Sequence, residues 1–200
     1  EKNENSLFMT GADNLEGKGP KKSKSHIEGE LVEGVHYQID KATGRLQRTG
    51  LGEIRQPYKW PVENERFAPD IERQAEADFC VGKIGEMLSG GTKSQRDIIK
   101  DLNQLGKRDI GDLAETLGSE WTSAEGPKSL AEIGKNGPWG AELNERPWTN
   151  FPKSLHSVIV EGPAAGGKGV TILDPFEATR YEMSIENFLK AWTRRCVYKK

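Results

Sequence analysis

Apolar residues recur at helical spacing in the middle of the chain. Over residues 78–88, 93–105 and 110–117 they fall three or four positions apart, which places them on one face of a helix. The pair Gly90-Gly91 ends the first of these segments, and Thr92 or Ser94 supplies the N-cap of the second. The sequence therefore predicts three successive helices.

The period changes to that of strands in the last quarter of the chain. Residues 155–160 and 170–173 are rich in β-branched side chains and flank a Gly-rich turn, which predicts a hairpin. A shorter strand is expected near residues 141–143, a helix over 185–192 after the cap residue Ser184, and a final strand over 196–198. Helices followed by a small antiparallel sheet indicate an α+β fold.

The first third of the chain has a different character. Residues 1–25 are polar and rich in Gly and Lys, so we expect a disordered arm. Two short alternating runs, residues 35–39 and 44–48, flank turn-forming residues and predict a second hairpin. Residues 50–69 contain three prolines, a density that argues against regular structure.

Charge and hydropathy narrow the classes of function. The 200 residues carry a net charge of −2, which offers no electrostatic case for binding nucleic acid or an anionic membrane. No apolar run approaches the roughly 20 residues that span a bilayer, and no signal segment opens the chain. Because the chain begins with Glu1 and not with Met, we expect a fragment of a longer polypeptide.

Cys80 and Cys196 are the two cysteines of the chain. Small disulfide-stapled domains carry many more, and no pair of residues shows the spacing of zinc ligands. We therefore expect no metal or other cofactor. Each cysteine is either a buried thiol or a reactive one, and the apolar surroundings of Cys196 in the sequence favour the core.

Cys80 lies in the first turn of the first predicted helix. A helix N-terminus stabilises a thiolate, although a buried structural cysteine is the commoner use of this residue. His156 lies on the first strand of the C-terminal hairpin, from which a base can take the thiol proton. Asp174 ends the second strand, where it either orients the imidazole or simply opens a turn before Pro175.

Together these segments resemble the papain-like cysteine protease superfamily. Gln74 stands six positions before Cys80, and the strands of His156 and Asp174 follow in the order of that family. The second strand ends in Asp174-Pro175-Phe176, which is similar to the corresponding sequence in the bacterial branch of the family. This branch comprises bacteriocin-leader peptidases, effector proteases and papain-fold toxins. The resemblance implies that Cys80, His156 and Asp174 are catalytic and that Gln74 helps to form the oxyanion hole. Val81, directly after the nucleophile, departs from the family pattern.

The resemblance also implies an organisation and a function. It covers about residues 70–198, so we expect a papain-like catalytic domain over residues 70–200, with its Cys helix packed on the sheet, and an extension over residues 1–69. The enzyme would attack an amide bond of a protein or peptide substrate through a thioester, as a protease or a glutamine deamidase. Bacterial members are effectors or toxins that act in a target-cell cytoplasm, which implies a cognate immunity protein. The alternatives are a non-catalytic scaffold for binding or delivery, and a cell-wall peptide hydrolase, for which Asp174 is an unusual partner.

Overall fold

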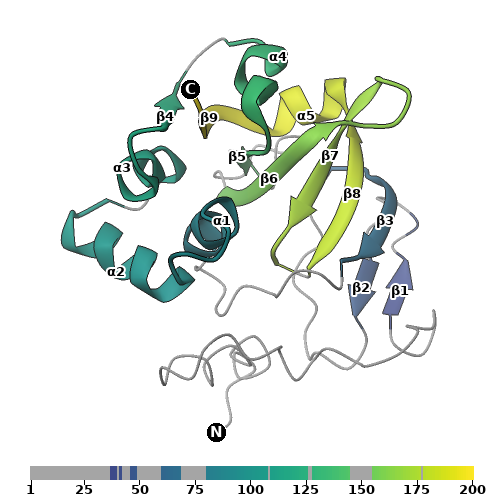
Figure 1. The fold of residues 1–200 in the computed structure, drawn as a ribbon. Helices are drawn as coiled ribbons and strands as arrows, with labels where there is room; N and C mark the ends of the chain where they lie inside the picture. The colour runs from purple at the N-terminus through teal and green to yellow at the C-terminus, as the bar shows by residue number, and fades with distance from the viewer. Residues whose placement is uncertain are drawn as a thin grey trace, which may run out of the picture.

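The computed structural model describes residues 37–39, 41, 46–48, 60–68, 80–107, 109–125, 128–144, 155–176 and 178–200 (Figure 1). These ranges contain strands β1 (Tyr37–Ile39), β2 (Leu46–Arg48), β3 (Glu63–Phe67), β4 (Trp121–Ala124), β5 (Trp139–Asn144), β6 (Leu155–Pro163), β7 (Gly169–Asp174), β8 (Thr179–Ser184) and β9 (Trp192–Lys199). Their helices are α1 (Cys80–Leu88), α2 (Gln95–Gln104), α3 (Leu113–Leu117), α4 (Leu130–Ile133), α5 (Ile185–Ala191) and the 3-10 turns η3 (Ile110–Asp112) and η4 (Gly134–Asn136). The described fold is thus α+β.

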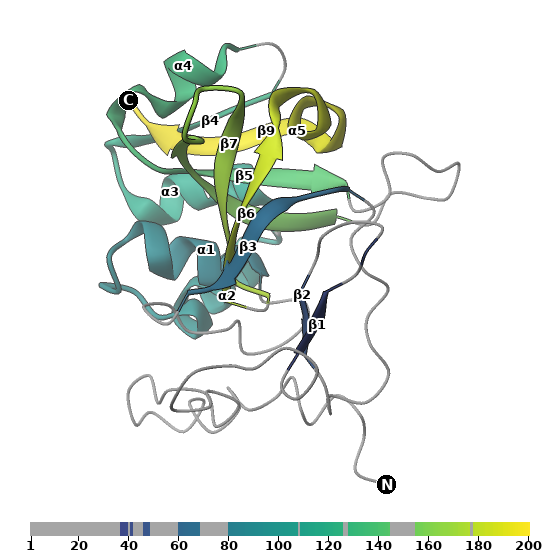
Figure 2. The same cartoon turned by 90° about the vertical axis from the view of Figure 1, so that its right-hand side faces the viewer.

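Seven of these strands form one antiparallel sheet. Their order across the sheet is β3-β8-β7-β6-β5-β9-β4, and every neighbouring pair is antiparallel. Strands β5, β6, β7 and β8 therefore lie side by side in the middle of the sheet (Figure 1), and the edge strand β3 faces the viewer in Figure 2. Strands β1 and β2 pair with each other as a separate hairpin, as the alternating runs of the sequence predicted.

Apolar side chains cover both faces of the sheet. On one face, α1, α2 and α3 pack over Ile159, Leu173 and Val197, as the layer of helices in Figure 1 shows. On the other face, α4 and α5 pack over a cluster that contains Val158, Ile172 and the aromatic residues Trp139, Phe188 and Trp192. Successive residues of β6 and β7 alternate between these two clusters, as the pleat of a strand requires.

Glycines on α1 allow this helix to approach α2 closely. An added Cβ at Gly82 would lie 2.6 Å from the Ile99 side chain and 2.7 Å from the carbonyl oxygen of Gln95. An added Cβ at Gly85 would lie 2.7 Å from the Ile98 side chain. The backbone oxygen of Gln95 cannot yield as a flexible side chain can, so α1 would have to move. Since Cys80 belongs to the same helix, this packing fixes its place.

The sequence predicted many of these elements with their caps. Ser94 caps α2 by accepting a hydrogen bond from the Asp97 N–H, and Ser184 caps α5 in the same way with Asn187. The β6–β7 hairpin and the strand near residues 141–143 are likewise confirmed. The expected arm over residues 1–25 and the boundary between residues 69 and 70 lie outside the described residues.

Three strands were not predicted, and each has a physical reason. Strand β3 lies in the Pro-rich segment that was expected to be irregular, but it falls between the prolines and pairs only with β8 at the edge of the sheet. Strand β8 carries charged residues between its buried Thr179, Tyr181 and Met183, so its alternation is half polar. Strand β4 is a short edge strand, and only Trp121 of its residues is buried.

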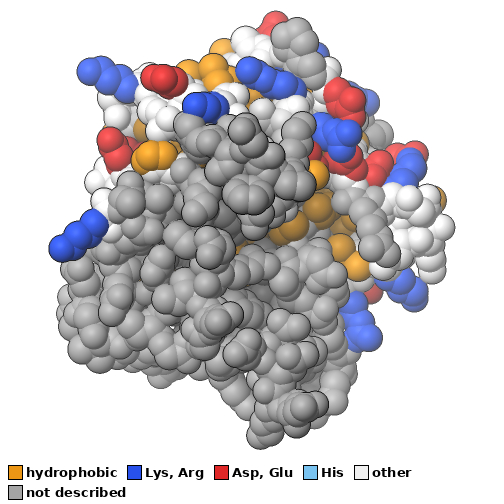
Figure 3. Space-filling view, turned by 180° about the vertical axis from the view of Figure 1, so that it is seen from behind, with side chains coloured by type: hydrophobic (Ala, Val, Ile, Leu, Met, Phe, Trp, Pro, Cys, Tyr) orange, Lys and Arg blue, Asp and Glu red, His pale blue; other side chains and the backbone are white. Residues whose placement is uncertain are grey.

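Charges on the surface are mixed in sign. Figure 3 shows acidic and basic side chains of the described residues lying beside one another on the face opposite to that of Figure 1. No helix in the described part of the chain is long and apolar enough to cross a membrane.

We predict that Gly82→Ala destabilises the fold. The contact with the Gln95 oxygen forces α1 away from α2, at a cost of about 1–3 kcal/mol, typical of overpacked cores. For a chain of this length, differential scanning calorimetry should show a melting temperature at least about 2–4 °C lower. Gly134→Ala is the matched control, because its Cβ would lie 3.5 Å from the nearest atom of Trp139, an ordinary contact. Equal melting temperatures for the two variants would contradict the prediction.

Candidate active site

Asp174 is a buried carboxylate that accepts hydrogen bonds from neighbours on its own strand end and on adjacent strands. The residue is 0% exposed at the end of β7. Its Oδ1 is 2.8 Å from His156 Nε2 and accepts from the Phe176 N–H at 3.0 Å, while Oδ2 accepts from the Tyr181 hydroxyl at 2.9 Å. The hydrogen bond from the Phe176 N–H belongs to the turn that Asp174 opens, and the hydrogen bond with His156 orients the imidazole ring. The sequence left these two roles as alternatives, and the structure combines them.

The register of the sheet explains why these groups meet. Ile159 pairs with Leu173, so one further step places Asp174 opposite Val158, two residues from His156 on the same face of the sheet. On the other side of β7, Asp174 pairs with Thr179, and Tyr181 lies two residues further on that face. His156, Asp174 and Tyr181 are therefore diagonal neighbours across β6, β7 and β8.

Cys80 meets His156 at the end of the sheet. Cys80 belongs to α1, which packs on the face of Ile159, whereas the alternation of β6 directs His156 toward the opposite face. His156 is the second residue of β6; it pairs with Leu143 of β5 but precedes the β6–β7 ladder. The Cys80 thiol is close enough to His156 and Ser157 for both residues to act on its charge. Nε2 of His156 faces Asp174, so Nδ1 is the ring nitrogen that can face the sulfur.

The two partners of His156 shift its protonation and that of Cys80. Burial lowers the pKa of His156, but the charge and hydrogen bond of Asp174, helped by Cys80, raise it to about 10. Burial alone raises the pKa of the Cys80 thiol, yet the hydrogen bond and charge of His156, together with Ser157, bring it below its ordinary value. Both shifts favour a thiolate beside an imidazolium. Such an ion pair is the reactive form of a cysteine nucleophile.

Phe176 shields this pair on one side. Its ring meets the His156 ring edge to face, with centroids 6.4 Å apart, and the side chain is buried. His156 itself is 3% exposed, whereas Cys80 is only partly buried. Cys80 is therefore less buried than His156, and the hydrogen bond between His156 and Asp174 is protected from water.

The other residues singled out in the sequence have different outcomes. Gln74 lies outside the described residues. Cys196 is 0% exposed, belongs to the core, and burial raises the pKa of its thiol to about 11. Among the described residues, no group of three or more His, Cys, Asp or Glu side chains is placed to hold a metal ion.

Sequence reasoning missed two residues of the site. Ser157 follows His156 directly and was counted only as a strand residue. Tyr181 lies in β8, a strand that was not predicted, and its contact with Asp174 depends on the register of two ladders. A buried tyrosine usually finds a partner for its hydroxyl, which is the one signal that the sequence offered.

Comparison with known proteins gives one informative similarity. No family model matches the chain. A protein of Escherichia coli O1:K1:H7 named cysteine protease effector 1 is 30% identical over 151 residues, which cover 70% of this chain. This similarity supports a relationship to bacterial cysteine protease effectors. The chain spans only 29% of the length of that relative, so the match concerns part of the larger protein.

We predict selective alkylation of Cys80. Because its thiol pKa is lowered, Cys80 should carry more thiolate at mildly acidic pH than an unperturbed cysteine, whose pKa is about 8.5. Cys196 has a raised thiol pKa and no exposed surface, so it should stay unlabelled in the folded chain. Peptide mass spectrometry after brief treatment with iodoacetamide measures both sites at once. Equal slow labelling of the two cysteines would contradict the ion pair.

We predict that Tyr181→Phe weakens both the fold and the site. It leaves Asp174 Oδ2 without the hydroxyl donor, at a cost of about 1–3 kcal/mol for a buried charged acceptor. Urea denaturation measures this loss, and slower alkylation of Cys80 would report the looser Asp174–His156 contact. Tyr198→Phe is the control, because Tyr198, a residue of β9, lies beside Lys128 and not beside Asp174. If the two variants lost the same stability and kept the same alkylation rate, Tyr181 would have no special role.

Proposed function

We propose that this chain is a cysteine protease domain that hydrolyses a peptide bond of a protein substrate, with Cys80 as nucleophile, His156 as general acid and base, and Asp174 as the group that orients His156. The observation that carries the proposal is the buried Asp174–His156 hydrogen bond, whose imidazole also contacts a partly exposed thiol with a lowered pKa. The name of the E. coli relative supports the protease over the deamidase.

Acylation follows from this arrangement. The Cys80 thiolate attacks the carbonyl carbon of the substrate, a C–S bond forms, and the oxygen becomes an oxyanion. The Cys80 N–H and, by resemblance to the papain-like family, the Gln74 side chain would donate hydrogen bonds to this oxyanion. The imidazolium of His156 then gives its proton to the amine nitrogen as the C–N bond breaks. The products are a thioester on Cys80 and a free amine.

Deacylation uses the same groups in the reverse order. Neutral His156 takes a proton from a water molecule, and the resulting hydroxide attacks the thioester carbon. The C–S bond breaks, the carboxylic product leaves, and the thiolate–imidazolium pair is restored. Asp174 keeps the ring in one orientation throughout, because the carboxylate is itself held by Tyr181 and Phe176.

The biological setting is part of the same proposal. We infer a papain-like effector or toxin domain over residues 70–200, delivered to act in the cytoplasm of a target cell and neutralised by a cognate immunity protein. The relative named as an effector supports this setting. The order of Gln74, Cys80, His156 and Asp174 along the chain supports the papain-like assignment.

We predict graded losses of cleavage in variants of the set. Cys80→Ala should abolish cleavage without loss of folding, whereas Cys196→Ala, the matched control, should lower stability but retain cleavage. Asp174→Asn, which keeps an acceptor for His156, should lower kcat about 10-fold, and Asp174→Ala should lower it about 100-fold or more. Equal rates for the two Asp174 variants would reduce Asp174 to a turn residue.

The direct test is expression in bacterial cells of the wild-type chain beside Cys80→Ala, followed by proteomics. New protein termini that appear only with the wild type would support the protease. Gln-to-Glu mass shifts without new termini would indicate a deamidase. No Cys80-dependent change of either kind would favour the non-catalytic scaffold.

A further inference from the structure

A second carboxyl side chain lies opposite Ser157 on the neighbouring strand. Glu142 is 6% exposed on β5, between Ala141 and Leu143, which face the α5 side of the sheet. The alternation of the strand therefore directs Glu142 to the side of α1 and η3. Its partner across the β5–β6 ladder is Ser157, the residue whose hydroxyl and backbone contact the Cys80 sulfur. Facing residues of an antiparallel pair have Cβ atoms about 5 Å apart.

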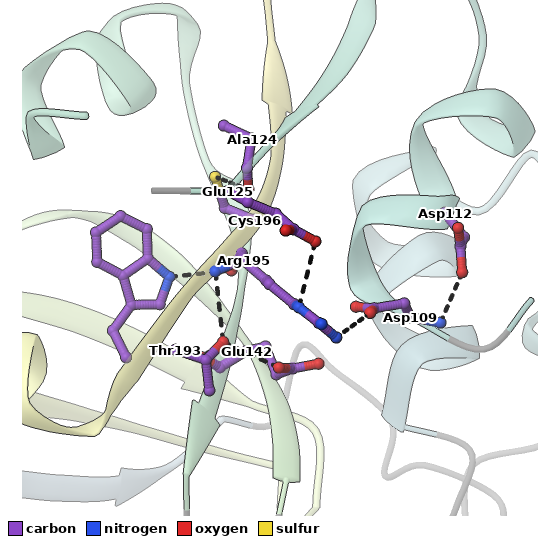
Figure 4. Close-up of polar contacts among 9 residues, drawn as sticks. Asp109, Asp112, Ala124, Glu125, Glu142, Thr193, Arg195 and Cys196 are labelled. Atoms are coloured by element: carbon purple, nitrogen blue, oxygen red, sulfur yellow. Dashed lines mark hydrogen bonds and ion pairs between the residues drawn. The ribbon is translucent and has the colours of Figure 1, made fainter. Parts of the chain in front are cut away.

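A bulge of β9 is built around this side chain. Ala141 pairs with Cys196, and Leu143 pairs with Trp192, so a step of two residues on β5 corresponds to four residues on β9. The extra residues form the bulge, in which Arg194 has a φ of +77°. The bulge turns the Thr193 hydroxyl toward Glu142, where it donates to Oε1 at 2.9 Å. Figure 4 shows Thr193 beside Glu142 and Arg195 reaching from the same strand to Asp109. Bulges commonly serve to redirect side chains in this way.

Asp109 completes the cluster from the opposite layer. It precedes η3, and its Oδ2 is paired with Arg195, which also reaches Glu125 at 3.4 Å. Its Oδ1 is buried and has no hydrogen-bond donor among the described residues. The Asp109 carboxyl group is close enough to Glu142 to act on it electrostatically. Two like charges this close repel each other, and a proton on Glu142 would remove the repulsion and supply a donor.

The electrostatics of Glu142 agree with this geometry. Burial raises the pKa of the Glu142 carboxyl, and the charge of Asp109 raises it further, against the lowering effects of Thr193 and Arg195. The Asp112 carboxylate, on η3, accepts the Asp109 backbone N–H. A proton on Glu142 would give the otherwise unpartnered Oδ1 of Asp109 a hydrogen-bond donor.

We propose that Glu142 is a positioning residue for the Cys80 nucleophile, and that it acts through one proton shared with Asp109. The shared proton joins β5 to η3 at the level of Ser157 and keeps the carboxyl group behind Ser157 neutral beside the thiolate. Loss of the proton puts two negative charges in contact between the sheet and the helical layer. Ser157 and Cys80 are then held less firmly. The proposal rests on the proposed function for its effect on catalysis, but the shared proton itself does not.

The sign of the pH effect follows from the raised pKa of Glu142. The pair contributes full stability below the ordinary Glu pKa of about 4.3, and this contribution is lost as pH rises through the folded value. Glu142→Gln has no proton to lose, yet its amide can donate to Asp109 Oδ1 and accept from Thr193. Glu142→Gln therefore keeps the hydrogen bonds of the protonated pair at every pH. Glu142→Ala lacks these hydrogen bonds at every pH.

The test is the melting temperature of wild type and Glu142→Gln from about pH 5 to about pH 9. We expect the wild-type value to fall by at least about 2–4 °C more than that of Glu142→Gln over this range. Glu142→Ala should be less stable than Glu142→Gln throughout. Parallel curves for wild type and Glu142→Gln would overturn the proposal.

A thermodynamic cycle with Asp109→Asn gives an independent readout. The side-chain amide that this substitution introduces can donate to the Glu142 carboxylate, so the variant should flatten the same pH dependence, and the double variant should add nothing. Separate, additive changes would show that no proton is shared. In cleavage assays Glu142→Gln should extend activity to higher pH, as expected of a positioning residue. If the chain cleaves nothing, the melting cycle still decides the shared proton, so the two proposals fail separately.

Discussion

The buried carboxylate of Asp174 is the constraint on which the candidate site depends. A charge without exposed surface is costly unless it is paired and hydrogen-bonded. Here a raised imidazole pKa supplies the positive partner, while the Tyr181 hydroxyl and the Phe176 N–H also donate to the carboxylate. These bonds connect β6, β7 and β8 on one face. The same imidazole lowers the pKa of the Cys80 thiol, so one buried anion acts on the proposed nucleophile through its neighbour.

The fold brings the reacting groups together from opposite faces of one sheet. Helix α1 packs on the side of Ile159, and the His156–Asp174–Tyr181 diagonal lies on the side of α5. The two meet where β6 extends beyond its ladder with β7, next to Ser157. Small residues, Gly82 on α1 and Gly140 on β5, let the helical layer come close enough for this contact. The strand opposite, β5, brings Glu142 to the same level from behind.

Much of this arrangement was predictable from local patterns, and the missed parts depend on register. A cysteine at a helix start and a histidine and an aspartate on successive strands are visible in the sequence, and the structure places them together. Tyr181 was missed because its strand is half polar and its contact requires the β7–β8 pairing. Glu142 was missed because nothing in its local sequence indicates the β9 bulge that surrounds it. The alternation of apolar and polar residues in the sequence indicates which face of the sheet a side chain lies on. It does not indicate which residues of the neighbouring strands lie diagonally beside it.

The thiolate–imidazolium pair is the central claim, and its most direct test is an ultraviolet titration of the thiolate. The difference in absorbance between wild type and Cys80→Ala isolates the Cys80 thiolate as pH is varied. We expect this signal to titrate well below the unperturbed cysteine pKa of about 8.5, and to return toward it in His156→Ala. A Cys80 thiolate that appears only at or above that value in the wild type, unchanged by His156→Ala, would contradict the account.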